Sequence, residues 1–270
     1  MKPLERQIQI VARLRALQRE MSVEELAALF STSPLTIRRD LDRLIGEGQI
    51  LRTHGGCVLR SIAESPFQKR LSVHYALKAA IGRAAAAEVQ RGQVILIDDG
   101  STTYHLAAGL GEVGALTVYT NSIAIIPLIS RFPQVLLRIL GGDYHRDLKF
   151  LGGSIPEWIL ERLEFDQAFV GADAIDADGR CLVGDLVVAR LTQLMLQRAR
   201  RRILLADHTK VGGSSHAVYG SLREFDLWIT TAGLEPIRIA PFREMTRILE
   251  AEAGAEDLPP GEKEEELSGQ

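Results

Sequence analysis

The chain has 270 residues, of which 46% are hydrophobic, so it has room for one small and one medium domain with packed cores and is not a disordered protein. Its formal net charge of -3 gives no hint of nucleic acid, but the charge is unevenly spread. Residues 1–60 carry ten Lys/Arg against seven Asp/Glu, whereas residues 250–270 carry one against eight. The net charge of the whole chain is therefore the sum of a basic N-terminal segment and an acidic C-terminal end.

Cysteine usage and hydropathy favour a reducing compartment. Cys57 and Cys181 lie far apart and without CxxC spacing, so neither a disulfide framework nor a zinc site is expected. The six histidines form no metal constellation, and no cofactor motif is present. No apolar run approaches the roughly 20 residues of a membrane helix, and the N-terminus lacks an apolar signal core. We expect a soluble cytoplasmic protein without metal, cofactor or membrane partner.

Two helices are predicted before residue 31. The first is marked by apolar residues on one face, with arginines on its solvated side: Leu4, Ile8, Val11 and Leu14, with Arg6, Arg13 and Arg15 opposite. The second begins at a capping box, Ser22-Val-Glu-Glu25, in which two side chains satisfy each other's backbone N–H groups. Its core face consists of Val23, Leu26, Ala27 and Phe30, and a tight turn follows at Ser31.

A third helix is expected to begin at Pro34, because Ser33 is a good N-cap and proline suits the first helical position. Ile37, Leu41 and Leu44 recur at spacings of four and three, which places them on the face that packs. The opposite face carries Thr36, Arg39 and Arg43.

The arginines of this helix are candidates for DNA contact. A guanidinium can grip guanine O6 and N7 or a phosphate bidentately, so Arg39 is our first choice for reading bases and Arg43 for base or backbone. Arg38 lies beside the apolar stripe and is expected to clamp the phosphate backbone.

A β-hairpin is expected after this helix, with a strand at Ile50-Leu51 and a turn or exit at Gly55-Gly56. Within this wing, Arg52 and His54 are candidates for phosphate or minor-groove contacts. Residues 1–60 thus predict a winged helix-turn-helix. Its DNA-contacting set is Ser33, Thr36, Arg38, Arg39, Arg43, Arg52 and His54.

Taken alone, arginines on an amphipathic helix usually form a solvated face, and only part of a basic surface contacts DNA. The combination of motifs is more specific. The segment Thr36-Ile-Arg-Arg-Asp-Leu41, followed by Gly48-x-Ile-x-Arg-x-His-Gly-Gly56, resembles the DeoR family of bacterial transcription regulators. This resemblance implies a protein that binds double-stranded operator DNA.

A second domain is predicted beyond a linker and lead-in helix at residues 61–78, where the chain turns mixed and polar. From residue 79 to 250, short apolar runs alternate with helical stretches, which predicts an α/β domain with a mainly parallel sheet. The strands are expected at residues 94–97, 116–119, 135–140, 167–170, 203–205 and 227–230. Residues 251–270 are expected to be an acidic disordered tail.

Ligands of open parallel sheets bind outside the carboxyl ends of the strands, where this chain places small and polar residues. Asp98-Asp-Gly-Ser-Thr-Thr103 precedes an expected helix from about Tyr104 to Leu110, so N–H groups, hydroxyls and the helix dipole would cradle a phosphate. It is neither a P-loop nor a dinucleotide fingerprint. Polar loops also follow other strands: Thr120-Asn-Ser122, Gly141-Gly142-Asp143, Gly171-Ala-Asp173 and Asp207-His-Thr-Lys210. Each is weak alone, but all would meet at one rim.

These loops make a candidate effector site. Lys210 suits a phosphate, whereas carboxylates and an amide suit sugar hydroxyls. The full set is Asp98, Gly100, Ser101, Thr102, Thr103, Asn121, Gly142, Asp173, Asp207 and Lys210.

Four of these segments resemble the effector domain of the DeoR family, which is similar to the sugar-phosphate isomerase and CoA-transferase fold. They are Asp98-x-Gly-Ser-Thr-Thr103, Thr120-Asn-Ser122, Gly141-Gly142 and Leu205-Ala-Asp-x-x-Lys210, and the whole resemblance covers residues 4–235. It implies a regulator, as a family habit a repressor, of a carbohydrate catabolic operon that responds to a phosphorylated sugar. The chain departs from the family at Thr231, where aspartate is common, and at Ala174, where glycine is usual, which bears on the shape of the pocket.

Two alternatives stay open. The second domain could still catalyse sugar-phosphate isomerisation, with Asp98, Asp173 and Asp207 as candidate bases, although no catalytic pairing is recognisable. The sheet could instead serve only for oligomerisation. One winged helix makes few phosphate contacts and operators present paired half-sites, so a homo-oligomer, dimer or tetramer, is expected. Binding without turnover is the favoured interpretation, and the chain is expected not to be an enzyme.

Overall fold

The computed structural model describes residues 3–17, 20–46, 50–53, 55–59, 66–254 and 257. The chain divides into two compact units, Met1–Lys69 and Arg70–Gln270, each with its own core. Residues 70–78, part of the segment expected to be a linker and lead-in helix, lie in the second unit. No helix within these ranges is long and apolar enough to cross a membrane.

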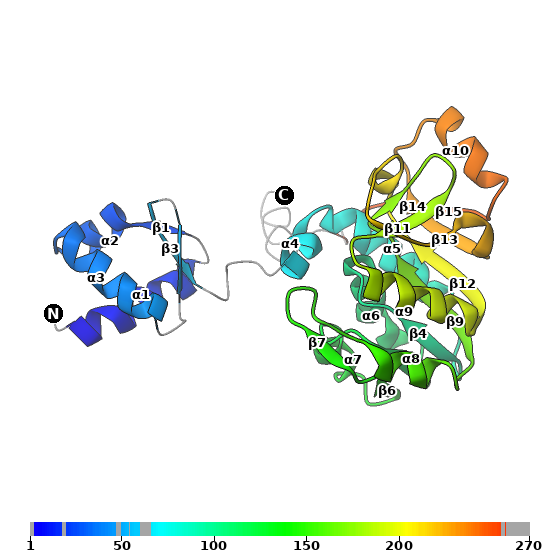
Figure 1. Ribbon diagram of the computed structural model, residues 1–270, viewed down its shortest axis with the longest axis horizontal. Coiled ribbons are helices and arrows are strands. Elements are labelled where there is room, and N and C mark those ends of the chain that lie inside the picture. Colours follow the sequence, from blue (N-terminus) through cyan, green and yellow to red (C-terminus); the bar gives the residue numbers. More distant parts are fainter. Residues whose placement is uncertain are drawn as a thin grey trace, which may run out of the picture. The chain divides into compact units, whose positions relative to one another are not determined.

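The described residues of the first unit form helices and a small antiparallel sheet (Figure 1). The helices are α1 (Pro3–Leu17), α2 (Val23–Leu29) and α3 (Pro34–Gly46). The strands β1 (Met21–Ser22), β2 (Ile50–Arg52) and β3 (Gly56–Leu59) pair in the order β1-β3-β2. Three helices followed by the β2–β3 hairpin form the winged helix-turn-helix that the sequence predicts.

Local capping explains where α2 and α3 begin. Glu25 N donates to Ser22 Oγ at 3.0 Å and Ser22 N donates to Glu25 Oε2 at 2.8 Å, which confirms the predicted capping box. At α3, Thr36 N donates to Ser33 Oγ at 3.2 Å and Pro34 is the first helical residue, as predicted.

Two predictions for α1 are wrong. Ile8 is 63% exposed, because the buried face of α1 runs through Ile10, Val11 and Leu14 instead. Arg6, expected on the solvated side, is only 7% exposed, because the same face extends back to it and brings it against a carboxylate of α3. The core that these helices share is otherwise as predicted and includes Leu14, Leu26, Ile37 and Leu41.

The second unit is built on a seven-stranded sheet in the order β15-β14-β12-β9-β4-β5-β6, in which all pairs are parallel. Its strands are β4 (Val94–Ile97), β5 (Leu116–Thr120), β6 (Val135–Ile139), β9 (Phe165–Gly171), β12 (Ala199–Leu205), β14 (Leu227–Thr231) and β15 (Ile248–Ala251). All strands but β15 match the sequence prediction. The chain moves outward from β4 to β6, then returns to β9 and continues the other way. Strand order therefore reverses between β4 and β9, where ligands of such sheets bind.

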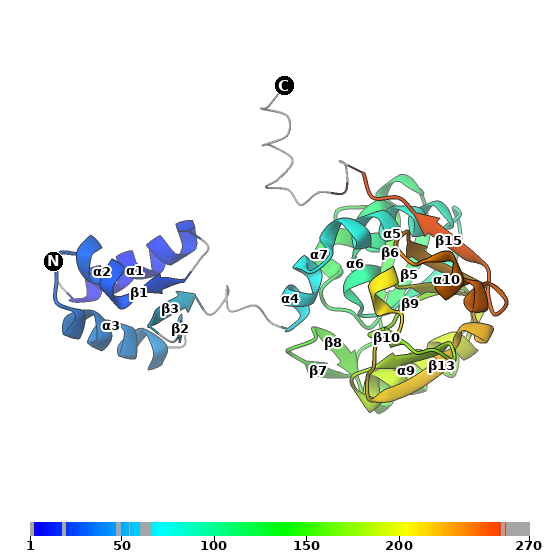
Figure 2. The same cartoon turned by 90° about the horizontal axis from the view of Figure 1, so that it is seen from above.

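Helices cover both faces of this sheet (Figure 2). One layer contains α5 (Tyr75–Ala87), α6 (Ser101–Gly109) and α7 (Ile126–Ile129), and the other contains α8 (Ser154–Leu160), α9 (Leu186–Gln197) and α10 (Pro236–Arg243). In β4, Ile95 and Ile97 join the first layer and Leu96 joins the second. Because side chains alternate along a strand, the central strands are buried on both faces, which explains their continuous apolar runs.

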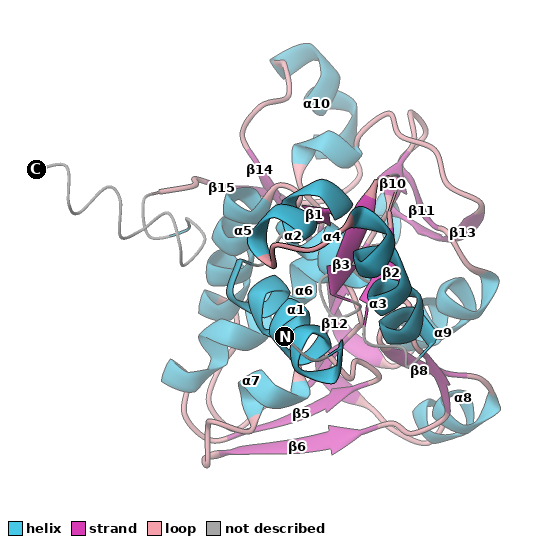
Figure 3. Cartoon of the chain, turned by 90° about the vertical axis from the view of Figure 1, so that its left-hand side faces the viewer, coloured by secondary structure: helices cyan, strands magenta, loops and turns pink. Residues whose placement is uncertain are grey.

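Smaller elements complete the second unit. A three-stranded sheet consists of β10 (Ala174–Ile175), β11 (Arg180–Val183) and β13 (Ala217–Ser221), and a hairpin consists of β7 (Asp143–His145) and β8 (Phe150–Gly152). The short helices of this unit are η1 (Leu110–Glu112), η2 (His208–Lys210) and η3 (Leu222–Glu224), and α4 (Pro66–Ser72) spans the boundary between the two units. Figure 3 shows β6 as the edge strand beside β5.

Two segment boundaries differ from the sequence prediction. Helix α6 begins at Ser101 rather than near Tyr104, because Tyr104 N already donates to Gly100 O at 3.0 Å and the Ser-Thr-Thr run forms the first turn. At the C-terminus, β15 extends to Ala251, and Asp257 is 3% exposed with its Oδ2 at 2.6 Å from Arg83 Nη2. Ala251 and Asp257 are thus buried, whereas Glu252 and Ala253 are exposed. Residues 255, 256 and 258–270 of the predicted acidic tail lie outside the described residues.

Candidate functional site

The exposed face of α3 carries most of the predicted DNA-contacting side chains. Arg38, Arg39 and Arg43 are exposed, and Thr36 is half-buried with its hydroxyl 2.9 Å from Ser33 Oγ. The apolar residues of α3 face the other way, into the core. Guanidinium groups on a solvated helix face are placed for a major groove and its flanking phosphates.

Buried polar contacts fix α3 against α1. Arg6 Nε donates to Asp40 Oδ2 at 2.6 Å, and Gln7 Nε2 donates to Asp40 Oδ1 at 2.8 Å. Asp40 is 4% exposed, so this is a buried ion pair in which both carboxylate oxygens are bonded. Because Asp40 directly follows Arg39, the pair sets the rotation of α3 and hence the direction of its arginine face.

The wing contributes one described candidate, Arg52 on β2. Its Nη2 donates to Asp42 Oδ1 at 2.6 Å, and both side chains are more than half exposed. Such a surface pair is worth about 1 kcal/mol or less, so a DNA phosphate can replace the carboxylate. His54, the other wing candidate, lies outside the described residues.

In the second unit, Asp98 joins the ends of β4 and β9 at the point where strand order reverses. Its Oδ2 accepts from Gly171 N at 2.6 Å, and its Oδ1 accepts from Thr103 Oγ1 at 2.6 Å and from Gly100 N at 2.9 Å. Burial raises the pKa of Asp98, and these hydrogen bonds act against that rise. Asp98 therefore holds the rim together, with its oxygens engaged inside the protein.

Asp99 and Asn121 link the ends of β4 and β5. Asn121 Nδ2 donates to Asp99 Oδ1 at 3.1 Å. Burial raises the pKa of Asp99 to about 7, the charge of Asp98 raises it too, and the bond from Asn121 lowers it. Because Asp98 and Asp99 are neighbouring buried carboxyl groups, the state in which both are charged is disfavoured. Asp99 is a site residue that was not among those predicted from the sequence.

A group of cations converges beside this rim from α4, α5 and η2. Lys78 is 3% exposed in α5, and its Nζ donates to the backbone oxygen of Arg70 in α4. Burial lowers the pKa of Lys78 to about 8, the charge of Lys210 lowers it too, and Asp207 raises it. Arg70 Nη1 lies 3.5 Å from Asp173 Oδ1. The predicted Lys210 thus has two further cations nearby.

Sequence reasoning missed Arg70 and Lys78 because both lie in the segment assigned to the linker. One signal was available for Lys78, namely a charge among the apolar residues of the first half of α5. No comparable signal marks Arg70, which lies in a polar segment with other charges.

Several buried polar atoms at the rim have no hydrogen-bond partner among the residues the structure describes. They are Asn121 Oδ1, Ser122 Oγ, Asp207 Oδ2, Thr230 Oγ1, and Nε and Nη2 of Arg70. The four residues other than Arg70 are at most 1% exposed. An unpaired buried polar group costs about 1–3 kcal/mol, so such groups are normally paired. Their concentration at the strand ends is typical of a site that a polar ligand completes.

Within the described part of the chain, the other predicted effector-site residues make no side-chain hydrogen bond to the rim residues already named. Gly142 follows the edge strand with a φ of 115°, and the nearest atoms to a Cβ built there belong to Gly152 and Pro156. Ser101 and Thr102 are buried in the first turn of α6, beyond the N-cap Gly100. Of the two departures from the family pattern, Ala174 is buried in β10, and Thr231 Oγ1 lies 2.9 Å from His208 Nδ1. Thr231 thereby supports the turn that carries Asp207 and Lys210.

A surface cavity of about 880 Å³ lies apart from the rim residues described above. It is lined mainly by residues of α5, α6 and the segments that follow them. Its walls include Tyr75, whose ring meets His105 edge to face at 4.7 Å. Burial lowers the pKa of His105 to about 4, so this ring is neutral at pH 7. Within the described ranges, no group of three or more His, Cys, Asp or Glu side chains could hold a metal ion.

Known proteins resemble both units. Family models match residues 6–63 as a DeoR-like helix-turn-helix domain and residues 73–232 as a DeoR C terminal sensor domain. The chain is 35% identical over 217 residues to HTH-type transcriptional regulator GlpR of Haloferax volcanii, with 79% of this chain and 84% of the relative covered. It is 31% identical over 215 residues to the glycerol-3-phosphate regulon repressor of Escherichia coli (strain K12), with 78% and 84% covered. The solved structure of ribose 5-phosphate isomerase A from Neisseria gonorrhoeae aligns at a TM-score of 0.37 and 17% identity, over 52% of this chain and 53% of that chain.

Proposed function

Because this chain belongs to the DeoR family of DNA-binding transcriptional regulators, we propose that its second unit binds a phosphorylated sugar at the strand-end rim and thereby controls binding of operator DNA by the first unit. The observation that carries this proposal is that buried polar atoms without partners within the described residues lie at the same edge of the sheet as three cations, the buried Lys78 and the half-buried Arg70 and Lys210. The DNA contacts are assigned to α3 and the wing, as described above.

The chemistry of the rim supports a ligand with a charged end and a hydroxyl-bearing end. Arg70, Lys78 and Lys210 offer charge-assisted hydrogen bonds to a phosphate. Asp99 and Asn121, on the β4–β5 side, offer both donors and acceptors to hydroxyl groups. The name of the Escherichia coli relative, a glycerol-3-phosphate regulon repressor, supports a small phosphate ester as the class of ligand.

Control of DNA binding requires a ligand with different affinity for two states of the protein. We propose that a homo-oligomer, a dimer or tetramer, holds two DNA heads at operator spacing. Phosphorylated sugar shifts the population toward an arrangement that no longer fits the half-sites, which relieves repression of a carbohydrate catabolic operon.

We propose binding without turnover. An isomerase needs a general base at a sugar carbon. Asp98, a candidate by residue type, has both oxygens engaged by Gly100, Thr103 and Gly171. Asp207 Oδ1 accepts from Thr209 N at 3.0 Å, and we assign its remaining oxygen, Oδ2, to a hydrogen bond with a ligand hydroxyl; the search for isomerised product below tests this assignment against a role as a base.

A thermal-shift screen tests the proposal, with phosphorylated sugars and glycerol 3-phosphate compared with their unphosphorylated counterparts on the full chain. We expect stabilisation only by a phosphorylated compound, release of operator DNA by that compound, and no isomerised product. Lys210→Ala should abolish the stabilisation and keep DNA binding. Stabilisation by none of the phosphate esters would overturn the effector assignment, and product formation would make the second unit an enzyme.

A further inference from the structure

The second unit exposes several large apolar side chains on one group of elements. Leu136, Tyr144, Ile155, Trp158 and Leu186 are between 51% and 78% exposed. They lie on β6, β7, α8 and the first residue of α9. We term this surface, defined by these five residues, the α8 patch.

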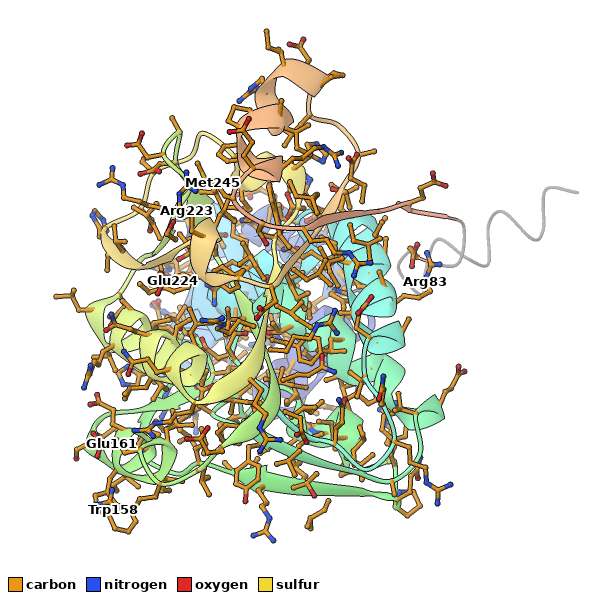
Figure 4. All side chains as sticks on the ribbon, turned by 90° about the vertical axis from the view of Figure 1, so that its right-hand side faces the viewer. Arg83, Trp158, Glu161, Arg223, Glu224 and Met245 are labelled. Atoms are coloured by element: carbon orange, nitrogen blue, oxygen red, sulfur yellow. The ribbon has the colours of Figure 1, made fainter. Side chains whose placement is uncertain are left out.

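The elements of the α8 patch adjoin one another. Strand β7 pairs with β8, and α8 packs on both β8 and α9. A Cβ at Gly141, just after β6, would lie 3.6 Å from Ile155 Cγ2, which places the end of β6 beside α8. Figure 4 shows Trp158 on the outer surface, on the side of the unit opposite Arg83. Clustered exposed apolar side chains of this kind mark interaction surfaces.

The Trp158 side chain is held in place by Arg162. The guanidinium of Arg162 lies 4.2 Å from the centre of the Trp158 ring, and Arg162 Nη1 donates to Trp158 O at 2.8 Å. Trp and Arg are the residues that most often carry binding energy in protein interfaces. A ring held in this way loses little conformational freedom when a partner covers it.

The charges around the patch indicate what covers it. They are of both signs. Glu161 pairs with Arg162 at 3.5 Å and Glu157 with Arg190 at 3.6 Å, and Arg138, Asp143, Arg146 and Asp147 are exposed on β6 and the β7–β8 hairpin. A two-fold axis through such a surface sets a mixed-sign rim against an identical one, which lets each pair exchange partners with its copy. A partner of one charge sign, such as nucleic acid, gains no such complementarity.

We infer that the α8 patch is the surface through which two copies of this chain associate, with Trp158 near the centre of the interface. The inference rests on the proposed function in one respect, since paired operator half-sites require two DNA heads. The patch is also joined to the effector site. Leu151 N in the hairpin donates to Asn121 O at 2.8 Å, and Ile123 N donates to Lys149 O at 2.9 Å. A ligand that engages Asn121 therefore acts on a segment continuous with the interface.

Sedimentation velocity of the full chain over a range of concentrations tests the inference. Trp158→Asp should raise the dimer dissociation constant at least about 30-fold, the effect of losing one interface hot spot. Ile155→Asp should act in the same direction. Ile237→Asp is the matched control, because Ile237 is 79% exposed on α10, outside the patch, and the dissociation constant should not change. Thermal melting of each variant checks that the fold is intact.

Tryptophan fluorescence of the unaltered chain gives a second measurement. The chain has two tryptophans, and Trp228 is fully buried in the core, so changes with concentration report on Trp158. Acrylamide quenching should increase as the protein is diluted through the dissociation constant. The inference is overturned if the wild type is monomeric throughout, if Trp158→Asp keeps the wild-type mass, or if quenching does not change while the mass does. Neither measurement uses DNA or sugar phosphate. A negative result would therefore leave the proposed effector site unaffected, and a protein that binds no sugar phosphate could still form the proposed dimer.

Discussion

The two candidate sites treat charge in opposite ways. In the first unit, the buried carboxylate of Asp40 has both oxygens bonded, while the arginines assigned to DNA lie in solvent. At the rim of the second unit, Lys78 is buried, and Arg70 and Asp207 have buried atoms without partners within the described residues. A surface that binds DNA is complete before DNA arrives, because phosphates displace only water and counterions. A pocket for a small polar ligand is incomplete until the ligand binds, because the buried polar groups of the pocket have lost their hydrogen bonds to water and have no other partner.

The comparison predicts that removing a charge destabilises the first unit where the charge is paired. Asp40→Ala leaves Arg6 buried without its carboxylate and should lower the unfolding free energy of the first unit by about 3–5 kcal/mol. Hydrogen exchange of the α3 amides in the full chain measures the loss. Asp42→Ala is the control, because its pair with Arg52 is more than half exposed and is worth about 1 kcal/mol or less. Equal losses in the two variants would show that burial does not decide the strength of these pairs.

At the rim the same kind of change should leave stability intact and remove ligand binding. Arg70→Ala should weaken the binding of a phosphorylated sugar by about 1.5–3 kcal/mol, the usual contribution of hydrogen bonds to charged groups. The unliganded protein should melt at nearly the same temperature, because the removal of two unpaired buried nitrogens offsets the loss of the partly exposed ion pair with Asp173. Isothermal titration and thermal melting measure the two quantities. Arg200→Ala, at a side chain that is 77% exposed, serves as the control. A lower melting temperature with unchanged affinity would make Arg70 a structural residue.

Substitution of an exposed arginine on α3 should weaken DNA binding without changing stability or effector binding. Arg39→Ala should weaken operator binding by about 1–3 kcal/mol and reduce discrimination against a mismatched site, as expected for a lost base contact. Fluorescence anisotropy at several salt concentrations separates this from a phosphate contact, whose loss weakens all sequences alike and lowers the salt dependence. Arg13→Ala, at an exposed position on α1, is the control. A uniform loss across sequences would move Arg39 from base reading to the backbone.

The sequence predicts the first unit more completely than the rim, for a physical reason. The capping box at Ser22 and the helix start at Pro34 are local signals, decided within one turn of the chain. Apolar runs likewise reveal strands that are buried on both faces. Lys78 and Lys210 are 132 positions apart by number, and only packing of the helices against the sheet brings their charges together. The same limit explains Arg6, whose partner in α3 cannot be read from the periodicity of α1.

The buried cation of α5 gives the rim a pH dependence of known sign. Because burial lowers the pKa of Lys78 to about 8, its amine is charged at pH 7 and becomes neutral above pH 8. A phosphate must then be bound together with a proton, so affinity should fall by roughly 25-fold between pH 7.5 and 9.5. Stability without ligand should rise over the same range, because the unfolded chain, with a lysine pKa near 10.4, holds more protons than the folded one. Lys78→Arg keeps its charge and should flatten the affinity profile. A wild-type affinity that stays constant through pH 9.5 would remove Lys78 from the phosphate site.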